Sequence, residues 1–140
     1  MAIPDAFVLF VDDVRQEVGN KTSYMGAYGT DLVFDETHGT VLLRLVVTTF
    51  LQWHTESPPD GWFLHVQLPT ESPPPISLPP EGAPILPDQD SGLVRLTVQV
   101  VVVQLPLSDG TRIEVALVKD EERKLLGFLN LKRATAASTP

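Results

Sequence analysis

The residues best suited to chemistry lie near the start of the chain, where charged side chains follow a short apolar run. The carboxylates of this part of the sequence are Asp12, Asp13, Glu17, Asp31, Asp35 and Glu36. Hard cations such as Ca²⁺ need several oxygen ligands held by loops. If turns bring these side chains to one end of the fold, the segment Asp12–Asp31 predicts a small-ligand or divalent-cation site.

The same polar cluster has a structural interpretation, which we favour. Arg15 can form a two-pronged pair with a neighbouring carboxylate. Gly26 and Gly29 allow positive φ or a close backbone approach, and Tyr28 can pack its ring while its hydroxyl is hydrogen-bonded. On this interpretation the cluster is a clasp that holds the chain together, with no bound metal or cofactor.

Signals for catalysis are absent from the sequence. The chain has no cysteine, and no serine stands in a G-x-S-x-G motif. His38, His54 and His65 lack the spacing of metal ligands, although His54 and His65 would face each other if their strands pair. Without a positioned nucleophile or general base, we expect a protein that is not an enzyme and needs no cofactor.

Apolar and polar residues alternate with period two through most of the chain, which predicts strands rather than helices. The expected strands are Ala6–Asp12, Thr22–Tyr28, Asp31–Phe34, Thr40–Gln52, Gly61–Leu68, Leu93–Gln104, Thr111–Lys119 and Arg123–Leu131. In the long strand from Thr40, the residues expected to share one face are Val41, Leu43, Leu45, Val47, Thr49 and Leu51. In the strand from Leu93 they are Val94, Leu96, Val98, Val100 and Val102.

This count of strands at short spacing predicts an all-β fold. We expect a two-sheet antiparallel sandwich of seven or eight strands, immunoglobulin-like, with a partly open barrel as the alternative. Asp109-Gly110 has the residues of a tight hairpin turn, so the last three strands should form a meander.

Proline dominates the segment between the strands that end near Leu68 and begin near Leu93. Ten of the thirteen prolines lie between Ser57 and Ser91, and proline cannot donate to a sheet ladder. We therefore expect a single domain over residues 1–133, with a Pro-rich surface loop at 69–92 and a flexible tail at 134–140. Its apolar residues Ile76, Leu78, Ile85 and Leu86 should anchor the loop, although Pro84–Pro87 also resembles a polyproline ligand.

Charge and hydropathy narrow the choice of partner. The net charge of −8 disfavours nucleic acid and anionic lipid. The first apolar run is short and ends at Asp12-Asp13, which predicts neither a signal peptide nor a membrane span. A cytoplasmic protein with no nucleic-acid and no membrane partner is the expectation.

One resemblance rests on the opening segment Asp12–Asp31, DDVRQEVGNKTSYMGAYGTD. It resembles a family of small uncharacterised bacterial and prophage proteins with the pattern C-D-D/I-R-x-E-x-x-x-K-x-S-x-x-G-x-Y-G. The matching positions are Asp13, Arg15, Glu17, Lys21, Ser23, Gly26, Tyr28 and Gly29. Val11 departs from the pattern, standing where the family often has a cysteine or small residue. The resemblance covers about the first thirty-five residues, and it implies a β-sandwich of bacterial or phage origin without assigning an activity.

These observations together favour a non-enzymatic protein-interaction or self-assembly module, with small-ligand or cation binding as the alternative. The partner would be a protein or another copy of the chain, a homodimer being favoured because both faces of the two long strands carry apolar residues. Large aromatic residues are the expected anchors, although core burial of the tryptophans is the stronger expectation. The candidate site residues are Asp13, Arg15, Glu17, Lys21, Tyr24, Tyr28, Trp53 and Trp62, with Phe63 as a further aromatic anchor.

Overall fold

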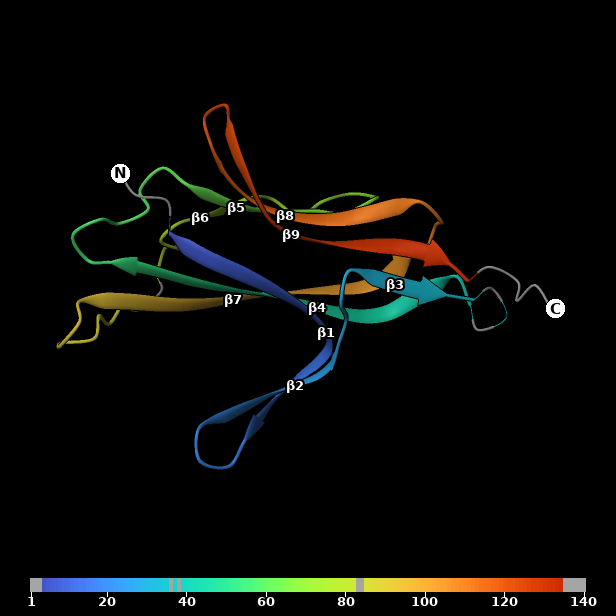
Figure 1. Ribbon diagram of the computed structural model, residues 1–140, viewed down its shortest axis with the longest axis horizontal. Coiled ribbons are helices and arrows are strands. Elements are labelled where there is room, and N and C mark those ends of the chain that lie inside the picture. The colour runs from blue at the N-terminus through green and yellow to red at the C-terminus, as the bar shows by residue number, and fades with distance from the viewer. Residues whose placement is uncertain (1–3, 36, 38, 83–84, 135–140) are drawn as a thin grey trace.

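Two β-sheets packed face to face make up the protein (Figure 1). The structure is a computed structural model that describes residues 4–35, 37, 39–82 and 85–134. The first sheet has the order β2 (Lys21–Ala27), β1 (Asp5–Glu17), β4 (Val41–His54) and β7 (Leu93–Pro106). The second has the order β3 (Asp31–Phe34), β9 (Glu122–Arg133), β8 (Thr111–Lys119), β5 (Phe63–Gln67) and β6 (Ile76–Ser77). The two sheets do not close into a barrel, so the expected sandwich is confirmed.

The strand order is that of an immunoglobulin-type sandwich. In that fold the strands A, B, E and D form one sheet, and C, F and G form the other. Here β1, β4 and β7 take the order A-B-E, while β5, β8 and β9 take the order C-F-G. Strand β3 adds to the second sheet by pairing in parallel with β9. No strand among the described residues takes the place of D beside β7.

The expected meander of the last three strands is wrong. Strand β7 pairs with β4, and β8 belongs to the other sheet, where it pairs with β5 and β9. The turn at Asp109-Gly110, with a φ of 80° at Gly110, therefore carries the chain from one sheet to the other. Alternation of apolar residues defines which face of a strand is buried, but it does not define which strand lies beside it.

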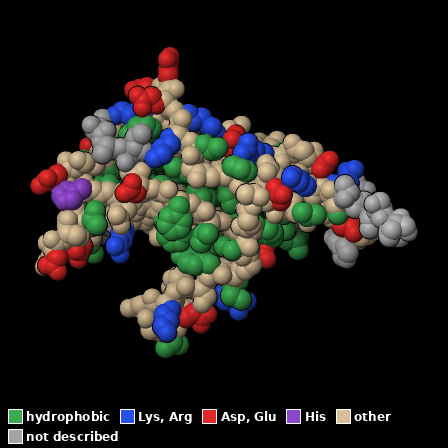
Figure 2. All heavy atoms as spheres, in the orientation of Figure 1, with side chains coloured by type: hydrophobic (Ala, Val, Ile, Leu, Met, Phe, Trp, Pro, Cys, Tyr) green, Lys and Arg blue, Asp and Glu red, His purple; other side chains and the backbone are tan. Residues whose placement is uncertain are grey.

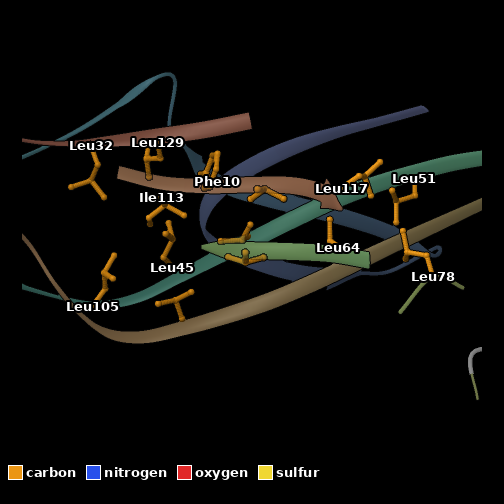
Figure 3. Packing of buried hydrophobic residues seen from close by; sticks show 14 of the residues in the cluster. Phe10, Leu32, Leu45, Leu51, Leu64, Leu78, Leu105, Ile113, Leu117 and Leu129 are labelled. Carbon is orange, nitrogen blue, oxygen red and sulfur yellow. The ribbon is translucent and has the colours of Figure 1, made fainter. Parts of the chain in front are cut away.

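Branched aliphatic residues from both sheets fill the space between them (Figure 3). Leu45 of β4, Leu117 of β8 and Leu129 of β9 are fully buried. Trp53 and Trp62 also lie in this core, with 6% and 3% of their surface exposed. Their core burial was expected, and it removes both tryptophans from the candidate partner-binding residues.

The alternation in β7 is confirmed, since its even-numbered residues from Val94 to Val102 all face the core. In β4 the alternation fails near the beginning of the strand. Leu42 and Leu45 both face the core, whereas Leu43, between them, is 75% exposed. Gln104, which lies beside Leu43 in the ladder, has a φ of +52° that interrupts the pleat. This irregularity turns Leu43 away from the expected buried face.

The Pro-rich loop runs over the surface and contributes only the two-residue edge strand β6. Leu78 anchors it, being 2% exposed and part of the core, and Ile76 packs against the same core. Leu86, in contrast, is 84% exposed, so its expected anchoring role is wrong. Pro84 and the tail from residue 135 onward lie outside the described residues.

Strand β1 is longer than expected, because it continues through the polar cluster to Glu17. Its first half pairs with β4 from Asp5 to Val11, and its second half pairs with β2 from Val11 onward. The hairpin of β1 and β2 consequently projects from the body of the sandwich (Figure 1). No helix in the described part of the chain has the length and apolar character needed to cross a bilayer.

Candidate functional site

A clasp at the base of the projecting hairpin joins Asp12, Gly26 and Tyr28. The Tyr28 hydroxyl donates a hydrogen bond of 2.5 Å to Asp12 Oδ1. Gly26 has a φ of +67°, and a Cβ there would collide with the Asp12 carboxylate. Partial burial and the neighbouring Asp12 carboxylate raise the pKa of Tyr28 to about 12. These contacts agree with the structural interpretation of the cluster.

Asp13, at the base of the same hairpin, lies between Arg15 of β1 and Arg44 of β4. Arg15 Nε donates to Asp13 Oδ2 at 3.2 Å, and Arg44 approaches Oδ1 at 3.4 Å. The expected two-pronged contact of Arg15 is therefore wrong, since each arginine uses one carboxylate oxygen. The hydrogen bond from Arg15 is the main reason that the pKa of Asp13 lies below its ordinary value.

Of the other carboxylates of the candidate cation site, neither Glu17 nor Asp31 lies beside Asp13, and Glu36 lies outside the described residues. Glu17 and Lys21 face each other in the ladder at the far end of the hairpin, where both are exposed. Asp31 lies on the other sheet, where Asn130 Nδ2 and Lys132 Nζ donate to its two oxygens at 3.1 and 3.2 Å. Among the residues that the structure describes, no group of three or more histidine or acidic side chains is arranged to hold a metal ion.

His54 and His65 belong to different sheets, so their strands do not pair and the condition for the two side chains to face each other is not met. His54 Nδ1 accepts a hydrogen bond of 3.2 Å from the Glu56 amide, and its ring lies against Gly92. His65 lines a shallow apolar hollow with Phe63 on the outer face of the second sheet. His38 lies outside the described residues.

Three aromatic rings meet on the outer face of the first sheet. Phe7 of β1 and Phe50 of β4 stack with their centroids 4.6 Å apart and an interplanar angle of 17°. Tyr24 of β2 meets Phe50 edge-on at 5.5 Å, so the projecting hairpin contributes one side of the cluster. Phe7 remains 57% exposed. Stacked and edge-to-face rings form a rigid apolar surface.

Beside these rings lies a groove with a volume of about 440 Å³, which we call the aromatic groove. Its lining residues are Asp5, Ala6, Phe7, Phe50, Leu51, Gln52, Arg95, Leu96 and Thr97. Arg95 Nε donates to Gln52 Oε1 at 3.1 Å, which holds this polar rim together. Figure 2 shows hydrophobic side chains gathered above the projecting hairpin. The groove therefore combines an apolar floor with a rim that carries charges of both signs.

Of the candidate residues, Asp13, Arg15, Tyr24 and Tyr28 lie near the base of the hairpin, whereas Glu17 and Lys21 lie toward its tip. The sequence pattern indicated Tyr24 as a candidate but did not indicate Phe7 or Phe50. Both faces of Ala6–Val11 carry apolar residues, which is a signal that the outer face is covered or used. Phe50 gave no signal of its own because the polar residues Thr48 and Gln52 flank it on the same face.

No model of a known protein family matches the chain, and no curated protein matches it. The resemblance of Asp12–Asp31 to a bacterial and prophage family therefore stays a prediction.

Proposed function

We propose that this chain is a non-enzymatic protein-interaction module that binds its partner through the aromatic groove. The observation that carries the proposal is the stacked pair of Phe7 and Phe50, of which Phe7 is more than half exposed. An exposed aromatic cluster within a polar rim is typical of a protein-binding surface. The bacterial or phage origin and the cytoplasmic location implied by the resemblance belong to the same proposal.

The groove fits an extended protein segment that carries one large apolar side chain. Phe7 and Phe50 present a flat surface against which an aromatic or branched side chain can pack. At the rim, Asp5 and Arg95 offer a carboxylate and a guanidinium for polar groups of the bound backbone. Such a combination gives affinity through the apolar contact and orientation through the rim.

Phe7→Ser tests the proposal because it removes the more exposed ring without opening the core. The matched control is Val33→Ser on β3, which is 63% exposed on the other sheet. Peptides are selected from a random displayed library on the native chain, and their dissociation constants are then measured on all three proteins by fluorescence anisotropy. We expect binding to the native chain and to V33S alike, and at least about tenfold weaker binding to F7S.

Two outcomes overturn the proposal. One is a selection that enriches no peptide, and the other is a set of peptides that binds F7S as tightly as the native chain. Circular dichroism spectra of the variants establish that F7S keeps its β structure, because a loss of binding through unfolding would also abolish the spectrum.

A further inference from the structure

The four edges of the two sheets differ in how they are protected against pairing with another chain. Proteins blunt edge strands by keeping them short or by placing proline or charge on them. Strand β6 has two residues followed closely by Pro79, and β3 has four residues beginning with Asp31. Strand β2 begins with Lys21 and contains Gly26 at positive φ.

Strand β7 has none of these protections along most of its length. It has fourteen residues, LVRLTVQVVVVQLP, in which Arg95 carries the only charge and Pro106 is the last residue. It pairs with β4 alone, and outside that ladder no backbone hydrogen bond joins Val94–Pro106 to another described residue. This edge is the place that strand D occupies in an immunoglobulin sandwich.

The direction of the free backbone groups follows from two hydrogen bonds at the start of β7. The Gly92 carbonyl accepts from Thr55, next to the end of β4, whereas the Leu93 carbonyl accepts from Asp88 in the Pro-rich loop. Because backbone groups alternate between the two sides of a strand, the odd-numbered residues from Arg95 to Val103 point their N–H and C=O groups away from β4. These residues are Arg95, Thr97, Gln99, Val101 and Val103.

We propose that β7 pairs with the β7 of a second copy of this chain, antiparallel about a two-fold axis at Gln99. Two features limit the stretch of β7 that can pair with a second strand, and they thereby fix this register. At its beginning, Asp88 already occupies the Leu93 carbonyl, and at its end Gln104 leaves strand geometry with a φ of +52°. Gln99 is the midpoint of the run Arg95–Val103 that remains.

In this register Gln99 faces Gln99 of the other copy, Thr97 faces Val101, and Arg95 faces Val103. Each of these pairs exchanges two backbone hydrogen bonds. The chain as a whole carries a net charge of −8. In this register, however, no like charges oppose each other, so a second copy meets little electrostatic repulsion at this edge. A self-pairing strand is also an isologous interface, which is the commonest form of protein dimer.

Part of the Pro-rich loop lies near one end of this edge without pairing with it. A hollow of about 350 Å³ lies beside Val100–Val103, and its other wall is formed by residues of the Pro-rich loop, including Leu68 and Pro73. The loop makes no backbone hydrogen bond to β7 beyond Leu93 within the described residues. Val101 and Val103, which are 49% and 64% exposed, would be partly covered by the other copy.

Cysteine cross-linking tests both the dimer and its register, because the native chain contains no cysteine. Facing residues in a hydrogen-bonded pair have Cα atoms about 5.5 Å apart, within the range of a disulfide. Under mild oxidation Gln99→Cys should form a covalent dimer by itself. Thr97→Cys and Val101→Cys should each react slowly alone and at least about tenfold faster when mixed. Val33→Cys on β3 is the exposed control.

A second measurement is sedimentation at tens of micromolar chain. The native chain should sediment as a dimer, with twice the 15.4 kDa mass of one chain. Gln99→Pro should sediment as a monomer, since proline removes an N–H of the open edge and leaves the bonds to β4 in place. The inference is overturned if the native chain sediments as a monomer, or if V33C cross-links as fast as Q99C. It does not rest on the aromatic groove, because F7S should dimerise like the native chain.

Discussion

The Tyr28 hydroxyl donates a 2.5 Å hydrogen bond to the carboxylate of Asp12, joining the end of β2 to the middle of β1. The bond lies where β1 passes from its pairing with β4 to its pairing with β2. Tyr28 also packs against the core, and its backbone amide bonds the Phe10 carbonyl at 2.8 Å. One residue thus fixes the projecting hairpin to the sandwich through both its backbone and its side chain.

Tyr28→Phe should lower the free energy of unfolding by about 1 kcal/mol at neutral pH, because it removes a hydrogen bond to a charged group. Urea unfolding followed by circular dichroism measures the loss. An unchanged stability would show that the hydroxyl of Tyr28 is not held by Asp12 in solution.

The same bond predicts a dependence of stability on alkaline pH. The pKa of Tyr28 is about 12 in the folded chain against an ordinary 10.0, so folding favours the neutral phenol. Its contribution to stability is complete below pH 10 and is lost as the pH rises toward 12. In a Tyr24→Phe background Tyr28 is the only tyrosine. Titration of its ultraviolet absorbance should then give a midpoint near 12, and a midpoint near 10 would contradict the prediction.

Gly26→Ala should destabilise the protein more than Gly19→Ala does. Both glycines have positive φ, which costs alanine about 1 kcal/mol. A Cβ at Gly19 meets nothing within 4 Å, whereas one at Gly26 displaces Asp12 from Tyr28. Gly26→Ala should therefore lose about 1 kcal/mol more than Gly19→Ala in urea unfolding. Equal losses would mean that the Asp12 side chain moves aside without cost.

Thr48→Val should raise the melting temperature. Thr48 is fully buried between β1 and β7, and its hydroxyl has no hydrogen-bond partner among the residues that the structure describes. An unpaired buried hydroxyl costs about 1 kcal/mol or more, and valine has nearly the same shape. Thr111→Val is the matched control, because the Thr111 hydroxyl donates to the Ser108 carbonyl at 2.7 Å. Calorimetry should show opposite shifts for the two variants, and a lower melting temperature for T48V would contradict the prediction.

Asn130→Ala should raise the pKa of Asp31. The hydrogen bond from Asn130 is the largest cause that holds this pKa below its ordinary 3.8, followed by the bond from Lys132. Because folding favours the charged carboxylate, Asp31 contributes to the stability of the fold above pH 3.8. This contribution is lost as the pH falls through the lower pKa that Asp31 has in the folded chain. Carbon NMR of the Asp31 carboxyl measures the midpoint. Lys132→Met should also raise it, because that variant removes both a hydrogen bond and the attraction of a positive charge, and an unchanged midpoint in N130A would contradict the prediction.

The sequence predicted the sandwich because period-two alternation directly reflects which side of a strand faces the core. Val94 to Val102 illustrates this, since every even-numbered residue is where the pattern put it. The alternation could not predict that Gln104 has a positive φ, because glutamine rarely adopts that backbone conformation. It also could not predict that β7 pairs with β4 and not with β8, since strand pairing depends on contacts between residues far apart in the sequence.

Only the part of the candidate site that depends on local sequence could be predicted. Tyr28 and Gly26 were recognised as parts of a clasp because their residue types suit only a few local roles. The groove depends on Phe7 and Phe50, which lie forty-three positions apart in the chain and meet across two strands. Such a meeting is a property of the register, and no local pattern around either residue encodes it.

The parallel pairing of β3 with β9 has a consequence for folding during synthesis on the ribosome. The Asp31 carboxylate accepts a hydrogen bond from Asn130, a residue ninety-nine positions later, so β3 has no ladder until β9 has left the exit tunnel. Until then the side chains of Leu32 and Phe34, which become core residues, are exposed to water or covered by a chaperone. Translation that stalls before β9 would release a chain with those side chains uncovered, and nascent-chain proteolysis should cut it there.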